Sequence, residues 1–289
     1  MQTITNITIH KIAIMQKQLL TTVLLFLMAA CSVQAQQIVR ASGNVQIVTT
    51  AGTKTVIDGG GITFLGTSKW TATDDSIYVV KTTVGGTEGW LDSTAAGAMD
   101  PTSTGSVFLR GTNMQSFYGN TRFYNLFVRN SVGDTLLSSC EVRNNLHLDT
   151  GFVFTRTGYG NDSLWVSNPA IAAITSTSNY TRSWVNGRLS RTGNVIGSAT
   201  PNPAVAYLFP VGKTDSLYAP IKLAKVNATT TTWTAEYSQN TPFDRLNRFY
   251  PPVDHVSSVE YWEITSSNQG TTDDDAMLSL SWRGYSQVS

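Results

Sequence analysis

Charge is scarce in this sequence. Charged residues make up 13% of the 289 residues, and they nearly cancel, to a formal net charge of +1. A protein that binds nucleic acid or an anionic membrane through its charge needs a basic stripe or patch, and the sequence contains none. Neither class of partner is indicated. Low charge together with many β-branched and aromatic residues is instead typical of a folded all-β protein.

Cysteine and histidine are also rare. The two cysteines, Cys31 and Cys140, form no disulfide framework, and the three histidines have no zinc-ligand spacing. Cys140 is expected to be a small apolar filler inside the fold, with a reactive thiol as the alternative. Strand alternation would turn Arg143, the nearest cation, to the other face, where it cannot lower the thiol pKa. His147 lies between two leucines and should point away from them, onto the surface or between repeats.

Only one long apolar run is present, at residues 19–30, and it is too short for a comfortable membrane-spanning helix. Lys17 precedes it, and small residues after it offer a cleavage site behind Ala35, which is the pattern of a secretory signal peptide. Translation starting at Met15 would give a cleaner signal. The five residues ending at Cys31 resemble a bacterial lipobox, so lipidation of Cys31 is a second interpretation. Both predict an exported mature chain without a transmembrane span.

Short apolar strands return at a nearly constant interval in the middle of the chain. They are marked by Val107, Leu126, Leu146, Leu164 and Val185. Steps of about twenty residues are typical of one coil of a solenoid, and turn-forming Gly, Asn, Asp, Ser and Thr fill the gaps. A single coil cannot bury its apolar face alone, so such units stack. We predict a right-handed parallel β-solenoid; how many coils precede Val107 is left open.

The pattern changes near residue 200, where a Pro-Asn-Pro segment marks a break. We therefore expect a signal peptide at residues 1–35, a β-solenoid-like region at 36–198 and a β-sandwich-like region at 199–289. About five strands make a thin sandwich, and the chain stops just after a strand. This predicts that the sequence is a fragment of a longer protein.

Four segments resemble repeats of large secreted surface proteins of Bacteroidota-type bacteria. In order they are FYNLFVRNS at 123–131, WVNGRLSR at 184–191, FPVGK followed by YAPI at 209–221, and VEYWEI at 259–264. The resemblance covers roughly residues 119–289. It implies an adhesin-like β-repeat protein exported by the type IX secretion system, and it implies no catalytic residue. Such proteins usually end in a C-terminal sorting domain, and nothing in this sequence plays that part, so we expect either that the chain is cut short or that it leaves by another route.

Acidic residues on the coils raise a second possibility. They are Asp134, Glu141, Asp149 and Asp162. A polysaccharide hydrolase of this shape needs two carboxylates facing one groove, and the sequence leaves open which of the four share a side. Acidic residues at turns also occur for turn geometry alone. The runs at 74–75 and 273–275 suggest either solvated turns or, less strongly, calcium binding.

Four aromatic residues gather near the centre of the repeat region. They are Phe117, Phe123, Tyr124 and Phe127. We expect them to be internal stacks of a solenoid core, with a carbohydrate-stacking strip as the alternative.

These patterns predict an exported, non-enzymatic surface or extracellular protein, adhesin-like or structural. It would present an extended β surface to glycans or other cells, and secretion machinery would be a further partner. The alternatives are a β-solenoid polysaccharide hydrolase or lyase, or the non-catalytic arm of a longer secreted enzyme. No cofactor or metal is expected.

Overall fold

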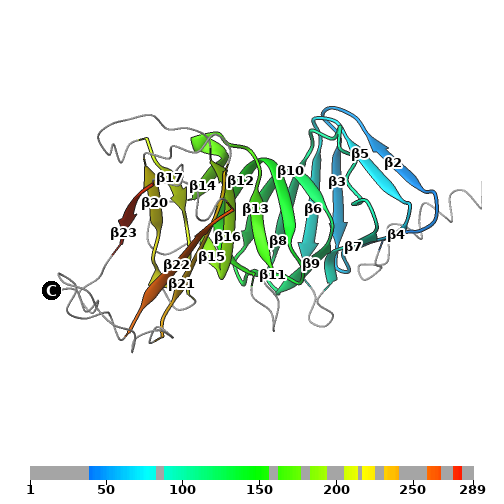
Figure 1. Ribbon diagram of the computed structural model, residues 1–289. Coiled ribbons are helices and arrows are strands. Elements are labelled where there is room, and N and C mark those ends of the chain that lie inside the picture. The colour runs from blue at the N-terminus through cyan, green and yellow to red at the C-terminus, as the bar shows by residue number, and fades with distance from the viewer. Residues whose placement is uncertain are drawn as a thin grey trace, which may run out of the picture. The chain divides into compact units, whose positions relative to one another are not determined.

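The computed structural model describes residues 39–82, 88–155, 162–176, 183–193, 205–213, 217–224, 231–240, 259–267 and 276–281. These residues contain β-strands, one three-residue 3-10 helix, η1 (Ile171–Ala173), and no α-helix, so the all-β class is confirmed (Figure 1). Ala35, Cys31, the acidic run at 273–275 and the expected boundary at 198–199 lie outside the described residues.

Ten strands form a large, nearly closed parallel sheet, in the order β1-β4-β7-β9-β11-β12-β10-β8-β6-β3. Face 1 consists of β1 (Val39–Ala41), β4 (Ile62–Gly66), β7 (Glu88–Thr94), β9 (Gln115–Gly119), β11 (Asp134–Leu136), the end of β12 (Cys140–Phe154) and β15 (Ser183–Asn186). Face 2 consists of β3 (Lys54–Asp58), β6 (Ser76–Lys81), β8 (Ser106–Gly111), β10 (Arg122–Asn130), the start of β12, β13 (Ser163–Val166), β14 (Ile174–Ser176) and β16 (Arg188–Gly193). The chain alternates between the two faces, which gives a β-helix-like stack.

A short third face covers the first coils. It pairs β2 (Gln46–Thr49) with β5 (Lys69–Ala72), and an isolated bridge joins Trp70 to Met99 of the next coil. Coils therefore exist before Val107, and Ile77 is its direct partner in the preceding coil. The longer connection that contains Met99 explains why the twenty-residue interval is lost there.

The predicted repeat is confirmed in register for its first three members, the fourth stacks on face 2 at a shifted register, and the fifth is wrong. Val107, Leu126 and Leu146 are in register on face 2. Leu164 instead pairs with Cys140, and Val185 belongs to face 1, where it pairs with Val153. The physical reason is an extra segment containing η1, which divides the next face-2 strand into β13 and β14. Ile174 of β14 takes the register position beside Leu146.

Large aromatic side chains fill the space between the faces. The ring centroids of Trp90 lie 5.1 Å from Phe64, 6.2 Å from Trp70 and 5.1 Å from Phe123. Phe117 and Phe123 are fully buried, which confirms the interpretation as internal stacks for two of the four clustered aromatics. Each such side chain contributes about 1.5–3 kcal/mol by leaving water, and none could do so in an isolated coil.

One corner of the stack requires glycine. Gly151 lies where β12 passes from face 2 to face 1, with φ at 84°. A Cβ atom there would lie 1.7 Å from the carbonyl oxygen of Asn130. The Asn130 side-chain amide is itself buried and donates to the carbonyls of Asn113 and Gly133, each at 2.9 Å. The corners of neighbouring coils are thus tied by one amide and approach too closely for a side chain.

We expect Gly151→Ala to lower the free energy of unfolding by clearly more than Gly52→Ala. Gly52 has a similar φ of 79° but nothing within 4 Å of the position of a Cβ. The control therefore carries only the left-handed backbone penalty, about 1–2 kcal/mol, whereas Gly151→Ala adds a backbone clash. Chemical denaturation of both variants measures the difference, and equal losses would contradict this account of the corner.

A buried carboxyl group lies beside the same corner. Asp134 is fully buried and accepts a hydrogen bond from Asn130 Nδ2 at 2.9 Å. Its Oδ2 atom and the Oε1 atom of Gln115, its register partner on β9, have no donor among the described residues. Burial raises the pKa of Asp134 to about 7. Protonation of Oδ2 would supply the missing donor, so the acid form fits this site better than the carboxylate.

Stability should therefore fall as pH rises. The pKa of Asp134 is about 7 in the folded protein, against an ordinary value of 3.8. Between these two pH values the folded protein binds a proton that the unfolded chain has lost, so stability falls as pH rises through this range. Above pH 7 the buried group is a carboxylate and the loss is complete. The full penalty is about 4 kcal/mol. Asp134→Asn mimics the protonated acid and should remove this pH dependence and raise stability at pH 8. Melting curves from pH 4 to 8 test this, and a variant less stable than wild type at pH 8 would contradict it.

The stack ends in antiparallel pairing. β16 pairs with β21 (Thr231–Ser238), which pairs with β22 (Tyr261–Ser266). A separate sheet joins β17 (Tyr207–Phe209), β20 (Ile221–Ala224) and β23 (Met277–Leu280), and β18 (Gly212–Lys213) pairs with β19 (Leu217–Tyr218). Antiparallel strands are present as expected, but a sandwich is not confirmed.

A buried arginine joins the stack to this last part. Arg191 of β16 is fully buried, donates to the carbonyls of Leu208 and Ala170, each at 2.9 Å, and lies 4.6 Å from the ring of Tyr207. Burial lowers its pKa to about 10, so it remains charged at neutral pH. The charge is stabilised by carbonyl oxygens and aromatic rings, which holds β17 and the segment before η1 against β16.

Candidate functional site

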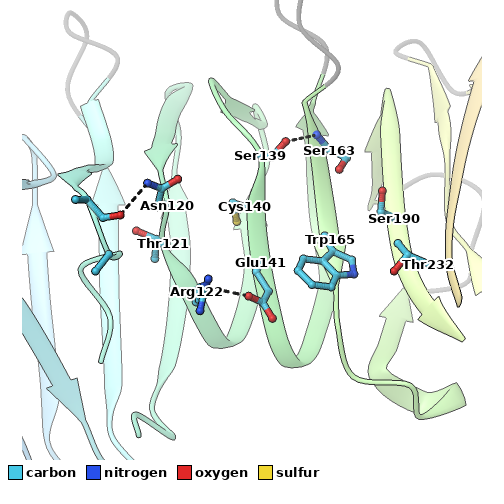
Figure 2. Close-up of a pocket in the computed structure, with 12 residues that line it drawn as sticks. Asn120, Thr121, Arg122, Ser139, Cys140, Glu141, Ser163, Trp165, Ser190 and Thr232 are labelled. Atoms are coloured by element: carbon cyan, nitrogen blue, oxygen red, sulfur yellow. Dashed lines mark hydrogen bonds and ion pairs between the residues drawn. The ribbon is translucent and has the colours of Figure 1, made fainter. Parts of the chain in front are cut away.

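A groove of about 640 Å³ crosses the outer side of face 2 near the start of its strands (Figure 2). Its lining combines hydroxyl and amide groups with apolar surface and carries few charges. The lining residues are Ala95, Ala96, Asn120, Thr121, Arg122, Ser139, Cys140, Glu141, Ser163, Trp165, Ser190 and Thr232.

The groove follows the stacking direction and not the strands. Arg122 pairs with Glu141, Glu141 with Trp165, and Trp165 with Ser190. The next strand, β21, pairs with β16 and contributes Thr232 to the lining. These residues form a row, the groove row, with one member from each of five adjacent strands. Neighbouring strands are about 4.8 Å apart, so the row is about 19 Å long. Such a site suits an elongated ligand better than a compact one.

One wall of the groove is a loop fixed by a buried acid. Asp92 at the end of β7 accepts hydrogen bonds from the backbone N–H groups of Thr94, at 2.9 Å, and Ala98, at 2.6 Å. It also accepts one from the hydroxyl of Thr121, at 2.5 Å, across to the next coil. Ala95 and Ala96 lie between these anchors and form the wall. The wall is therefore largely preformed.

Trp165 contributes the one aromatic surface among the described lining residues. It is half-buried, and its Nε1–H donates to the hydroxyl of Thr192 at 3.2 Å, which fixes the orientation of the indole. Figure 2 shows the ring beside Glu141, with Ser190 and Thr232 on the other side. A fixed, partly exposed indole beside hydroxyl groups can hold a ligand with both apolar and hydroxylated faces.

The only charges among the described lining residues neutralise each other. Arg122 Nε lies 3.3 Å from Glu141 Oε2, with the Arg122 side chain 57% exposed and the Glu141 side chain 16% exposed. The groove is therefore electrically neutral, and its cation is more accessible than its anion.

The four predicted carboxylates do not converge. Asp134 is in the core, Asp149 accepts from Arg129 Nε at 2.6 Å, and Asp162 accepts from the backbone N–H of Ser139 at 3.0 Å. Glu141 is the one carboxylate among the described lining residues. Glu141 and Asp149 are eight residues apart on one strand, about 26 Å. Paired hydrolase carboxylates lie about 5–9.5 Å apart.

Cys140 is a buried free cysteine on the floor of the groove. Burial, and then the charge of Glu141, raise the pKa of its thiol above the ordinary value. Arg143 is directed outward, where its Nη2 donates to the carbonyl of Ser103 at 2.8 Å. The Cys140 side chain is thus a small apolar filler, and the alternative of a reactive thiol is not supported.

Sequence reasoning missed a ladder of stacked rings further along the outer side of face 2. Ring centroids are separated by 4.6 Å from Tyr78 to Phe108, 4.3 Å from Phe108 to Phe127, and 4.1 Å from Phe127 to His147. Phe108, Phe127 and His147 are the middle residues of successive apolar triplets in the sequence. This regular position of a ring was the signal from which the ladder could have been predicted. The expected position of His147 between repeats is confirmed, and burial lowers its pKa. Because the rings cover one another's faces, the ladder offers a ligand only edges.

Metal-binding geometry does not appear in the part of the chain that the structure describes, where no three His, Cys, Asp or Glu residues cluster. Asp74 lies in a bend with φ at 45° and accepts from the hydroxyl of Thr104 at 2.9 Å, as a turn residue does.

No described helix has the length and apolarity to cross a bilayer.

Comparison with known protein families, with curated proteins and with solved structures finds no match for this chain. The functional argument therefore depends on the groove and its chemistry.

Proposed function

We propose that this chain is part of an exported, non-enzymatic surface or extracellular protein that contacts glycans or other cells through its stacked β surface. The observation that carries the proposal is the groove row, in which five adjacent strands supply a neutral track that combines hydroxyl groups with one fixed indole. The N-terminal signal pattern and the resemblance to adhesin-like surface proteins support export.

The spacing of the carboxylates favours binding over hydrolysis. A glycosidase of the common type needs two carboxylates across one bond, and Glu141 has no such partner among the described lining residues. The neighbouring Cys140 is buried and the pKa of its thiol is raised, so this thiol is not set up as a nucleophile.

Binding of the purified chain to arrays of cell-surface glycans and to intact cells tests the proposal. We expect Trp165→Ala to weaken glycan binding by about tenfold or more, because an aromatic anchor in a binding site contributes at least about 1.4 kcal/mol. Tyr118→Ala, which removes a 43% exposed ring of β9 outside the groove, should leave binding unchanged.

Two results would contradict the proposal. One is the absence of binding by the wild-type chain to every glycan and cell surface. The other is release of reducing ends or unsaturated sugars from a polysaccharide panel, abolished by Glu141→Gln, which would favour the enzyme.

A further inference from the structure

We propose that the groove binds a single uncharged polysaccharide chain laid along the stack, and that Glu141 determines this selectivity by neutralising Arg122. This inference rests on the proposed function and names its ligand class. It is carried by the direction of the groove, by the chemistry of its lining and by the Arg122–Glu141 pair.

The direction favours a linear polymer. The groove row crosses five adjacent strands, from Arg122 to Thr232, and each strand adds one side chain at about 4.8 Å intervals. A repeating ligand can therefore meet a repeating site. The preformed wall at Ala95 and Ala96 bounds one end of this track.

An extended peptide fits less well. Peptides that recognise sheets add a strand to a free sheet edge and gain their affinity from main-chain hydrogen bonds. The groove instead lies across the middle of face 2, where the backbone groups of β10, β12 and β13 are already paired with neighbouring strands. A ligand there must be recognised through side chains.

The side chains suit a sugar. Ser139, Ser163 and Thr232 supply hydroxyl groups, and each hydroxyl has one donor and two acceptor positions. The existing bonds, such as Ser163 N–H to Ser139 Oγ at 3.2 Å, leave capacity for a ligand. The fixed indole of Trp165 offers an apolar face to the C–H side of a sugar ring.

The charge pair decides between neutral and acidic sugars. Arg122 is exposed enough to meet a uronic acid, but such a carboxylate would also approach Glu141, 3.3 Å from the guanidinium. Attraction and repulsion at similar distances nearly cancel. The hydroxyls and the indole then favour an uncharged chain.

The experiment measures binding of the purified chain to neutral and uronic-acid oligosaccharides, matched in length from two to six sugars, by calorimetry. We expect wild type to bind neutral members, with affinity rising up to about five sugars, the number of strands in the row, and to bind uronic members of the same length more weakly. Glu141→Gln frees the charge of Arg122 and should tighten uronic-acid binding by about tenfold, in a salt-sensitive way. Glu263→Gln makes the same charge change at an exposed residue of β22 and should have no effect.

A second variant separates charge from folding. Arg122→Gln combined with Glu141→Gln removes both charges and should lose the uronic-acid binding that Glu141→Gln gained. Wild-type preference for uronic sugars, or equal uronic-acid binding by Glu141→Gln and wild type, would overturn the inference while leaving the proposed function standing. Affinity that does not depend on length would overturn the placement along the stack. No binding to any glycan or cell surface would remove both.

Discussion

The in-register stacking of parallel coils is the interaction on which the rest of this structure depends. A single coil leaves its inward-facing side chains uncovered above and below, so Leu126 is buried because Val107 and Leu146 lie beside it in the neighbouring coils. The same register places Phe108, Phe127 and His147 in an outer ladder. Core, ladder and groove are three consequences of one alignment.

The segments that resemble secreted surface proteins meet one another in the fold. Trp184 Nε1 donates to the carbonyl of Lys213 at 3.0 Å, and Trp262 Nε1 donates to the carbonyl of Ala219 at 3.1 Å. Arg191 ties β16 to β17, and Glu260 accepts from the hydroxyl of Tyr237 at 2.7 Å. These residues join the stack to the antiparallel strands after it. Their pattern is therefore explained by packing.

The groove is held in place both by the pairing of strands between coils and by hydrogen bonds of individual side chains. Its floor is fixed by the sheet ladder, its wall by the hydrogen bonds of Asp92, and its indole by Thr192. A binding site built on paired strands loses little conformational freedom when it is occupied, so more of the contact energy appears as affinity. The neutral charge balance depends on Arg122 and Glu141, which are nineteen residues apart in sequence and adjacent only through stacking.

The sequence by itself determined the all-β class, the stacking repeat from Val107 to Leu146, and the buried or inter-coil roles of Phe123, Cys140 and His147, because alternation and turn residues are local signals. Only the tertiary structure decided where the repeat is interrupted, since η1 displaces Leu164 and Val185 from the expected rows. It also decided that Asp134 is buried while Glu141 faces the groove, and that Trp165 adjoins Glu141. Those outcomes depend on the register between coils, and register is a property of the whole stack that no single coil encodes.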